Sequence, residues 1–355
     1  MMAIITCVII GAVLKTASSV VLPFTIAVLL AFVMYPLVKG LDKIRCPRFF
    51  SILLAVLIIV AGLWVFSFVI FSSGRMIIEQ YPQYEQRFNA ILEWAAGLVE
   101  LSIDEELTFL QNLWGQQIIR SFILDVTISF SNNIFGFVAN AVLVILLVVF
   151  LLIESNYIKE KLETAFGNRS DRVNKISRDM MHQVSRYLTA KFFISLATGL
   201  LIGGGLHLIG LEFAILWGVL VFLLNFIPNL GTIIGCVSIS LFAILQFWPN
   251  PVPIILVLAV VLSINIIIGN FLDPKIVGEH VGLSPLSVLV SLVLWGWIWG
   301  FVGMVLAVPM MSIVKIVCEN IPVLEPISVL LGSKKAVRAK KEEYEKAEAE
   351  QAGTK

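Results

Sequence analysis

The stretch Asn225-Phe226-Ile227-Pro228-Asn229-Leu230-Gly231 divides a long apolar segment, Phe213–Trp248, into two halves. A second apolar segment, Pro285–Val317, is divided in the same way by Gly300-Phe301-Val302-Gly303. As a straight helix, either segment would measure roughly 50 Å at about 1.5 Å per residue, whereas the hydrocarbon core of a bilayer is about 30 Å thick. Because proline removes a backbone donor and glycine loosens a helix, each segment is predicted to form a helical hairpin that enters the membrane.

The two interrupted segments also resemble each other. Gly210-Leu211 precedes the first and Gly282-Leu283 precedes the second, and the same offset carries Gly231 onto Gly303. Paired, interrupted apolar segments in corresponding positions indicate a transporter site between two repeats. A chance match between two stretches rich in leucine, valine and glycine is the alternative.

The composition predicts an all-α polytopic membrane protein. Hydrophobic residues make up 59% of the 355 residues and charged residues only 14%, with a mean hydropathy of +0.97. Soluble domains are nearer a quarter charged. The four cysteines form no CxxC pair and the three histidines have no ligand spacing, so we expect no metal and no cofactor. A formal net charge of +1 gives no reason to expect nucleic acid.

About eight membrane segments are expected, namely six full transmembrane helices and the two re-entrant hairpins. In the alternative topology, each half of both segments crosses the membrane completely. Four such crossings would leave the end of the chain on the same side as two re-entrant hairpins do. The six predicted full spans are Ala3–Leu14, Val20–Leu37, Ser51–Ser72, Ile134–Ile153, Phe192–Leu208 and Val252–Ile268.

The chain is predicted to have five parts in order. They are three spans in 1–75, an extracytoplasmic amphipathic helical insert in 76–132, the fourth span and a basic cytoplasmic helical segment in 133–187, a transport unit with both hairpins in 188–318, and a cytoplasmic tail in 319–355.

The insert carries an apolar stripe at helical spacing. Its members are Ile77, Tyr81, Tyr84, Phe88, Ile91, Ala95 and Leu98. Such a face can pack within the protein, join protomers, or lie on the membrane surface, and we favour the first two.

Loop charges predict the orientation. Residues 39–48 hold four basic residues and one acidic residue, whereas 76–132 hold eight acidic and two basic residues. Lysine and arginine near span ends mark the cytoplasmic side. Both termini are therefore predicted to be cytoplasmic, and the two hairpins are predicted to enter the bilayer from opposite faces.

Four stretches together resemble the signature of the autoinducer-2 exporter family, also called PerM-like permeases. They are Asn225–Gly231, Gly269–Gly278, Gly282–Ser284, and Trp295-Gly296 with Gly300–Pro309, and the resemblance covers residues 3–332. It implies a multi-pass secondary transporter in the inner (plasma) membrane of a prokaryote that exports a small polar signalling molecule in quorum sensing. Sodium(lithium)–proton antiport is the alternative within the family. The resemblance also implies a homo-oligomer in the lipid bilayer, with a pentamer as one form.

The predicted substrate site lies at the two breaks. Its members are Asn225, Pro228, Asn229, Gly231, Asn265, Asn270, Gly300 and Gly303. Amide side chains supply both a donor and an acceptor, which suits a hydroxylated solute. Polar groups at membrane depth are expensive and usually functional. Hydrogen bonds between helices are the structural alternative for each asparagine.

Asp273 is the candidate for coupling to a proton or sodium, since it follows the sixth predicted span directly. A helix cap or an ion pair with Lys275 is the structural alternative. No HExxH motif or phosphate-binding loop is present, and Gly282-Leu283-Ser284-Pro285 has only the bare outline of a serine-hydrolase motif. We therefore expect no enzyme. A channel or a membrane scaffold without transport activity is the remaining alternative.

Overall fold

The computed structural model describes residues 9, 11–98, 134–155, 157, 161, 164–165, 170–272, 282–321, 323–333 and 337–338. Regular structure in these residues is helical, apart from one isolated bridge between Leu283 and Gly332. Seven of the described helices are long and apolar enough to cross a membrane. The predicted all-α polytopic fold is confirmed.

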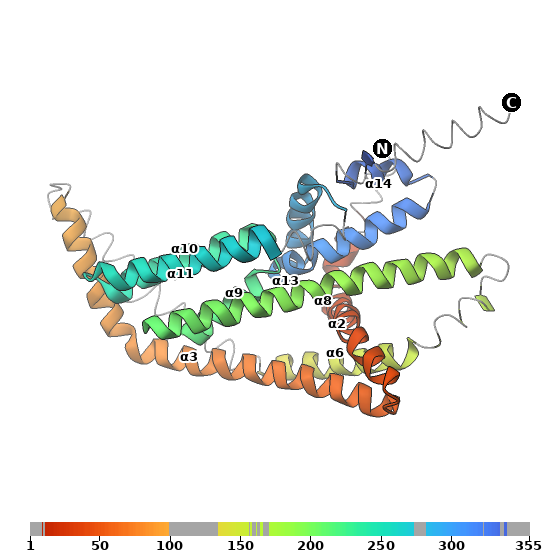
Figure 1. Ribbon diagram of the computed structural model, residues 1–355, viewed down its shortest axis with the longest axis horizontal. Coiled ribbons are helices and arrows are strands. Elements are labelled where there is room, and N and C mark those ends of the chain that lie inside the picture. The colour runs from red at the N-terminus through yellow and green to blue at the C-terminus, as the bar shows by residue number, and fades with distance from the viewer. Residues whose placement is uncertain are drawn as a thin grey trace.

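Figure 1 shows the order and arrangement of the helices. They are α2 (Ser18–Lys43), α3 (Arg48–Leu98), α6 (Ile134–Glu154), α8 (Ser170–Ile209), α9 (Ala214–Leu224), α10 (Leu230–Phe247), α11 (Pro251–Ile267), the π-helix η2 (Ile268–Leu272), α13 (Pro285–Asn320) and α14 (Glu325–Leu331). Five of the six predicted full spans coincide with α2, α3, α6, α8 and α11. The remaining predicted span, Ala3–Leu14, falls mostly outside the described residues.

The spanning helices carry large apolar side chains on their outer faces. Leu57 and Phe68 of α3, Val142 of α6 and Ile255 of α11 are all exposed. A soluble protein would bury such rows of side chains, and in a bilayer they face lipid.

One group of helices is formed by α2, α3 and α6, which share an apolar cluster that includes Ala27, Ala55 and Val148. Arg48 at the start of α3 donates to the Leu152 carbonyl and, at 2.8 Å, to the Ser155 hydroxyl, both at the end of α6. The end of α2, the start of α3 and the end of α6 therefore lie on one side. This is the arrangement expected of three consecutive crossings.

The helix α3 runs for 51 residues from the third span into the insert without interruption. At about 1.5 Å per residue it is about 75 Å long, more than twice the thickness of a bilayer core. The boundary expected between 75 and 76 falls inside this helix. The remainder of the insert, residues 99–133, lies outside the described residues.

The apolar stripe of the insert packs against the same chain. Tyr84 is only 8% exposed, and its ring lies 6.3 Å from the Phe213 ring and 5.5 Å from the Phe242 ring. Its hydroxyl donates to the Glu212 carboxylate. Further out on α3, Trp94 lies 4.6 Å from Trp248. The outer part of α3, from residue 76 to Trp94, is thus docked on the base of the α9–α10 pair.

The docking of α3 should weaken in Tyr84→Phe, which loses the donor to Glu212 but keeps the ring contacts. A typical intramolecular hydrogen bond contributes about 0.5–1.5 kcal/mol to stability. We expect faster amide hydrogen exchange across 76–94, with exchange in α2 unchanged. Unchanged exchange would show that the rings alone hold the contact.

The same contact should depend on pH. Burial disfavours the charged form of Glu212 and raises the pKa of its carboxyl above the ordinary value. A raised pKa in the folded state contributes stability that is complete below the unfolded pKa and is lost as the pH rises through the folded pKa. Docking is therefore strongest in acid, and Glu212→Gln, which keeps an acceptor but does not titrate, should flatten the pH dependence of the protection factors across 76–94, which are exchange rates divided by those of the unfolded chain.

A second group of helices is formed by α8, α9, α10 and α11, which share a cluster that includes Ile202, Leu206, Ile239 and Val257. The backbones of α8 and α9 approach closely at two glycines. A Cβ atom on Gly199 would lie 2.6 Å from the Gly218 carbonyl oxygen, and one on Gly218 would lie 2.7 Å from that of Gly199. Small residues permit this approach between membrane helices. In the Gly203-Gly204-Gly205 run α8 stays helical, so this run serves packing rather than bending.

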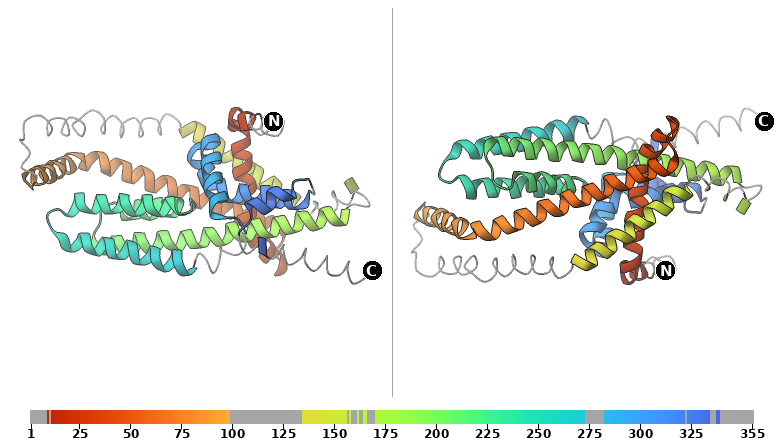
Figure 2. Two further views of the ribbon diagram at one scale, coloured as in Figure 1. Left: turned by 90° about the horizontal axis from the view of Figure 1, so that it is seen from above. Right: turned by 90° about the horizontal axis from the view of Figure 1, so that it is seen from below.

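The helix α13 is folded back on itself at Gly300, where φ is 62° and ψ is −141°. The Ser291 hydroxyl donates to the Ala307 carbonyl at 2.7 Å. Sixteen residues of straight helix would separate those groups by about 24 Å. The two halves of α13 therefore form a hairpin, and both figures show them diverging from the turn (Figures 1 and 2).

Candidate functional site

The tip of the first hairpin lies between Leu224, where α9 ends, and Leu230, where α10 begins. Pro228 lies in this break, as predicted from the sequence. Asn229 has φ 59°, a left-handed value that asparagine tolerates better than most residues. A Cβ atom on Gly231 would lie 1.7 Å from the Leu224 carbonyl oxygen, so the backbone of α10 rests directly on the end of α9. Only glycine fits there.

The second hairpin has an equivalent glycine. A Cβ atom on Gly303 would lie 1.9 Å from the Trp295 carbonyl oxygen. Gly231 and Gly303, which the sequence offset pairs, thus each pack on a carbonyl of the preceding half-helix, seven and eight residues earlier. The turn itself is at Gly300, and Gly303 belongs to the helix that follows it.

The tips of the two hairpins share one apolar cluster. Ile227 at the first tip is 2% exposed and belongs to the same cluster as Ile298 and Trp299 at the second tip, with Tyr187 and Leu188 of α8. In Figure 1, α9 and α10 extend from this meeting point toward one end of the molecule, and the second half of α13 extends toward the other. The breaks therefore lie in the middle of the molecule rather than at its ends.

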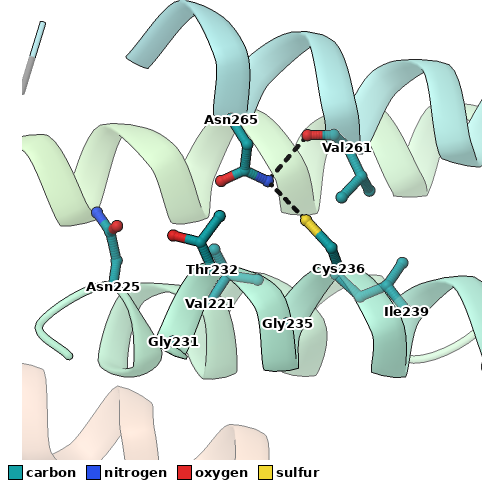
Figure 3. Close-up of a pocket in the computed structure, with 9 residues that line it drawn as sticks. All are labelled: Val221, Asn225, Gly231, Thr232, Gly235, Cys236, Ile239, Val261 and Asn265. Atoms are coloured by element: carbon teal, nitrogen blue, oxygen red, sulfur yellow. Dashed lines mark hydrogen bonds between the residues drawn. The ribbon is translucent and has the colours of Figure 1, made fainter. Parts of the chain in front are cut away.

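A small cavity lies beside the first break, between α9, α10 and α11 (Figure 3). It leaves about 10 Å³ for the centre of a water-sized sphere, which is room for about one water molecule. The lining residues are Val221, Asn225, Gly231, Thr232, Gly235, Cys236, Ile239, Val261 and Asn265. The lining carries no charged side chain.

Both asparagines in the lining are held by defined hydrogen bonds. The amide nitrogen of Asn225 donates to the Ser195 hydroxyl at 3.2 Å and to the Thr198 hydroxyl at 3.5 Å, both on α8. The amide nitrogen of Asn265 donates to the Val261 carbonyl at 2.9 Å and to the Cys236 sulfur at 3.3 Å. The hydrogen bonds between helices that the sequence left as an alternative are therefore present, and they orient both side chains.

The structure brings together three of the predicted site residues, Asn225, Gly231 and Asn265. The others do not line the cavity. Pro228 and Asn229 lie in the break, Gly300 and Gly303 lie in the second hairpin, and the exposed Asn270 lies in η2. Asp273 is outside the described residues.

Sequence reasoning missed the polar residues that support the cavity. Ser195 and Thr198 stand three residues apart, on one face of α8, and this spacing was the available signal. Thr232 directly follows the glycine of the break.

Lys191 was also missed. It is only 4% exposed although it lies within an apolar stretch that is long enough to span a membrane. It stands one helical turn before Ser195. The predicted span begins one residue later, at Phe192, so Lys191 lies at the end of that span, where a buried ionisable side chain is a functional candidate. In the part of the chain that the structure describes, no three histidine, cysteine or acidic side chains come together as metal ligands.

Two glycine-packed breaks in membrane-crossing helices, with a small polar cavity beside the first of them, are the features expected of a membrane transporter. The sequence comparisons agree with this class. The chain matches the family described as AI-2E family transporter over residues 3–322. It therefore belongs to the AI-2E transporter family, which is the family that the signature residues resemble.

Individual relatives are similar over most of their length. The chain is 34% identical to a candidate transport protein of Borreliella burgdorferi over 332 residues, 93% of this chain and 89% of that protein. It is 31% identical to the AI-2 transport protein TqsA of Escherichia coli K12 over 320 residues, 90% of this chain and 91% of TqsA. It is 23% identical to the candidate permease PerM of the same strain over 327 residues, 86% and 88% of the two chains.

Proposed function

We propose that this chain is a secondary transporter that exports a small, hydroxylated, polar solute across the inner membrane of a prokaryote, with autoinducer-2 as the first candidate. The observation that carries the proposal is the uncharged polar cavity beside the break of the first hairpin. Amide and hydroxyl groups exchange hydrogen bonds with solute hydroxyls, and the absence of charge from the lining suits a neutral solute. The similarity to TqsA supports the choice of autoinducer-2.

Transport requires the cavity to enlarge, because room for one water molecule does not admit a solute of several carbon atoms. The breaks at Pro228 and Gly300 are where the backbone can move. The close glycine contacts between α8 and α9 couple these two helices into one body. We propose that α8–α11 and α13 move against the group of α2, α3 and α6, which opens the cavity to each side in turn.

Flux measurements test the proposal. Purified protein in liposomes should release loaded autoinducer-2 when a sodium or a proton gradient is imposed, each gradient being tested separately. Empty liposomes serve as the control for leakage. If neither gradient drives flux above that control, the chain is not an exporter of this solute. Sodium-driven proton movement without solute would instead favour the antiporter function.

We also propose that both hairpins are re-entrant, that they enter from opposite faces, and that both termini are cytoplasmic. Accessibility to a membrane-impermeant thiol reagent in cells tests the orientation. A cysteine introduced at Glu85 on the outer part of α3 should label in intact cells, and one at Lys175 should label only after the membrane is breached. The background is a variant that lacks the native cysteines. Labelling of the Glu85 position only after breaching the membrane would reverse the orientation.

The proposed coupling role of Asp273 predicts a specific defect. Asp273→Asn should abolish gradient-driven flux and leave expression and thermal stability unchanged, because asparagine keeps the size of the side chain and removes its charge. Asparagine also caps helices nearly as well as aspartate, so a structural cap would lose only a few tenths of a kcal/mol, at most about 1 kcal/mol. Driven flux at the wild-type rate would leave Asp273 with the structural role.

A further inference from the structure

We propose that α14 and the basic segment that follows it form a binding surface for anionic phospholipid headgroups at the edge of the bilayer. The segment 334–341 holds five basic residues and no acidic residue. This surface lies in a different part of the chain from the solute cavity, and its binding of lipid does not depend on transport.

The helix α14 carries an apolar face that the rest of the described chain leaves uncovered. Val323, just before α14, is 85% exposed, Leu330 is 80% exposed, and Ile327 between them is also exposed. Their spacing of four and three residues matches one side of a helix. The side that carries Ser328 faces the protein, since this residue is buried. The short helix is therefore amphipathic, with its apolar side turned outward.

The position of α14 puts this apolar face beside lipid. Figure 1 shows the chain turning back after α13, so that α14 lies beside that helix. The Leu331 carbonyl accepts the Ser284 amide at 2.9 Å and the Ser287 hydroxyl at 3.1 Å, both at the start of α13. Leu286, in the same first turn of α13, is exposed like the lipid-facing side chains of the other spanning helices. The apolar face of α14 thus continues the surface that contacts lipid.

The charges beside α14 indicate which lipids it contacts. Arg338 is exposed shortly after α14 ends. Lys334, Lys335, Lys340 and Lys341 flank it in the sequence. Clusters of about four to eight lysines and arginines next to a spanning or amphipathic helix attract anionic lipids. In the orientation proposed above, these lipids belong to the cytoplasmic leaflet.

A second copy of the chain would be a poorer occupant of the same face. Each copy would bring its own five basic residues to the contact, and like charges repel. Anionic headgroups instead neutralise these charges, while their acyl chains cover the apolar face. The combination of apolar and basic groups therefore favours the lipid surface.

Lipid bound here would hold the open end of the second hairpin. The helix α14 follows the second half of α13 and is bonded through Leu331 to the start of the first half. The Ser333 amide adds a bond to the Gly282 carbonyl at 2.8 Å. Both ends of the hairpin are thus tied to α14, and lipid that binds α14 fixes them at one membrane surface.

Quenching by brominated lipids in vesicles tests the surface. A fluorescent dye is attached at Leu330→Cys in a full-length variant that lacks the native cysteines. The vesicles contain equal amounts of phosphatidylcholine and phosphatidylglycerol, with bromine on the acyl chains of one lipid or of the other. We expect phosphatidylglycerol to quench the dye at least about threefold more than phosphatidylcholine, because the basic segment enriches the anionic lipid. High salt screens the charges and should bring this ratio close to one.

The dye at Val142→Cys is the matched control, because Val142 is an exposed apolar residue of α6. The two lipids should quench it equally. Lys334→Gln, Lys335→Gln and Arg338→Gln combined should lower the ratio at Leu330 toward one, and size-exclusion chromatography checks that this variant is folded.

Equal quenching by the two lipids at Leu330, without the charge substitutions and at low salt, would overturn the proposal. Protection of the dye from both lipids would also overturn it. In that case, quenching by iodide in the water would show that the face is in solvent, and protection from iodide would show that protein covers it. No solute enters the measurement, so its outcome is independent of the flux assays.

Discussion

Gly231→Ala is expected to abolish the folded protein. The added methyl group would lie 1.7 Å from the Leu224 carbonyl oxygen, which is a backbone atom and cannot rotate away. That carbonyl also accepts the Ile227 amide at 2.8 Å, so moving it breaks the turn at the hairpin tip. We expect a loss of more than about 4 kcal/mol, in the range of the most damaging single substitutions. Size-exclusion profiles and thermal unfolding of the detergent-solubilised protein measure it.

Gly303→Ala should behave in the same way, because its methyl group would meet the Trp295 carbonyl oxygen at 1.9 Å. Gly204→Ala is the matched control. Apart from the backbone of its own helix, no atom lies within 4 Å of a Cβ atom at that position, and alanine is a better helix former than glycine by up to about 1 kcal/mol. We expect it to be as stable as wild type or slightly more stable. Wild-type stability of Gly231→Ala would show that the two halves of the first hairpin are not packed as described.

Asn225→Leu is expected to lower autoinducer-2 flux at least tenfold while the protein stays folded. Leucine has nearly the same size but removes the donors to Ser195 and Thr198, and it takes an oxygen from the cavity. Tenfold corresponds to about 1.4 kcal/mol, which is the scale of one or two hydrogen bonds in a protein interior. Initial rates from proteoliposomes, normalised to the amount of folded protein, measure the effect.

Asn229→Gly is the comparison for Asn225→Leu. Asn229 is exposed at the tip and does not line the cavity, and glycine accepts its φ of 59° without strain. We expect flux close to that of wild type. If Asn229→Gly loses as much flux as Asn225→Leu, the solute is bound at the tip of the hairpin and not in the cavity.

The breaks could be predicted because their causes are local. Pro228 and the glycines are written in the sequence, and a segment too long for the bilayer has to bend or tilt. The pairing of Gly231 with Gly303 was likewise visible as an offset. The exact position of the second turn could not be predicted, because both glycines of Gly300-Phe301-Val302-Gly303 suit a break. Only the folded hairpin shows that Gly300 makes the turn and Gly303 makes the packing contact.

The continuity of α3 could not be predicted from hydropathy. Hydropathy reports the surroundings of side chains, which change near residue 75, whereas the backbone stays helical across that point. The supporting role of Ser195 and Thr198 depends on which helix lies opposite α8. That is decided by the crossing at Gly199 and Gly218, a tertiary contact that a single sequence does not display.

In the orientation proposed above, the uninterrupted α3 allows the transport unit to be controlled from outside the cell. The single helix α3 extends from the spanning region to the base of the first hairpin. There Tyr84 contacts Phe213, which precedes α9, and Trp94 contacts Trp248, which follows α10. An antibody fragment that binds the outer part of α3 would act on the base of the first hairpin without entering the membrane. Inhibitors of this transporter therefore need not reach its cavity.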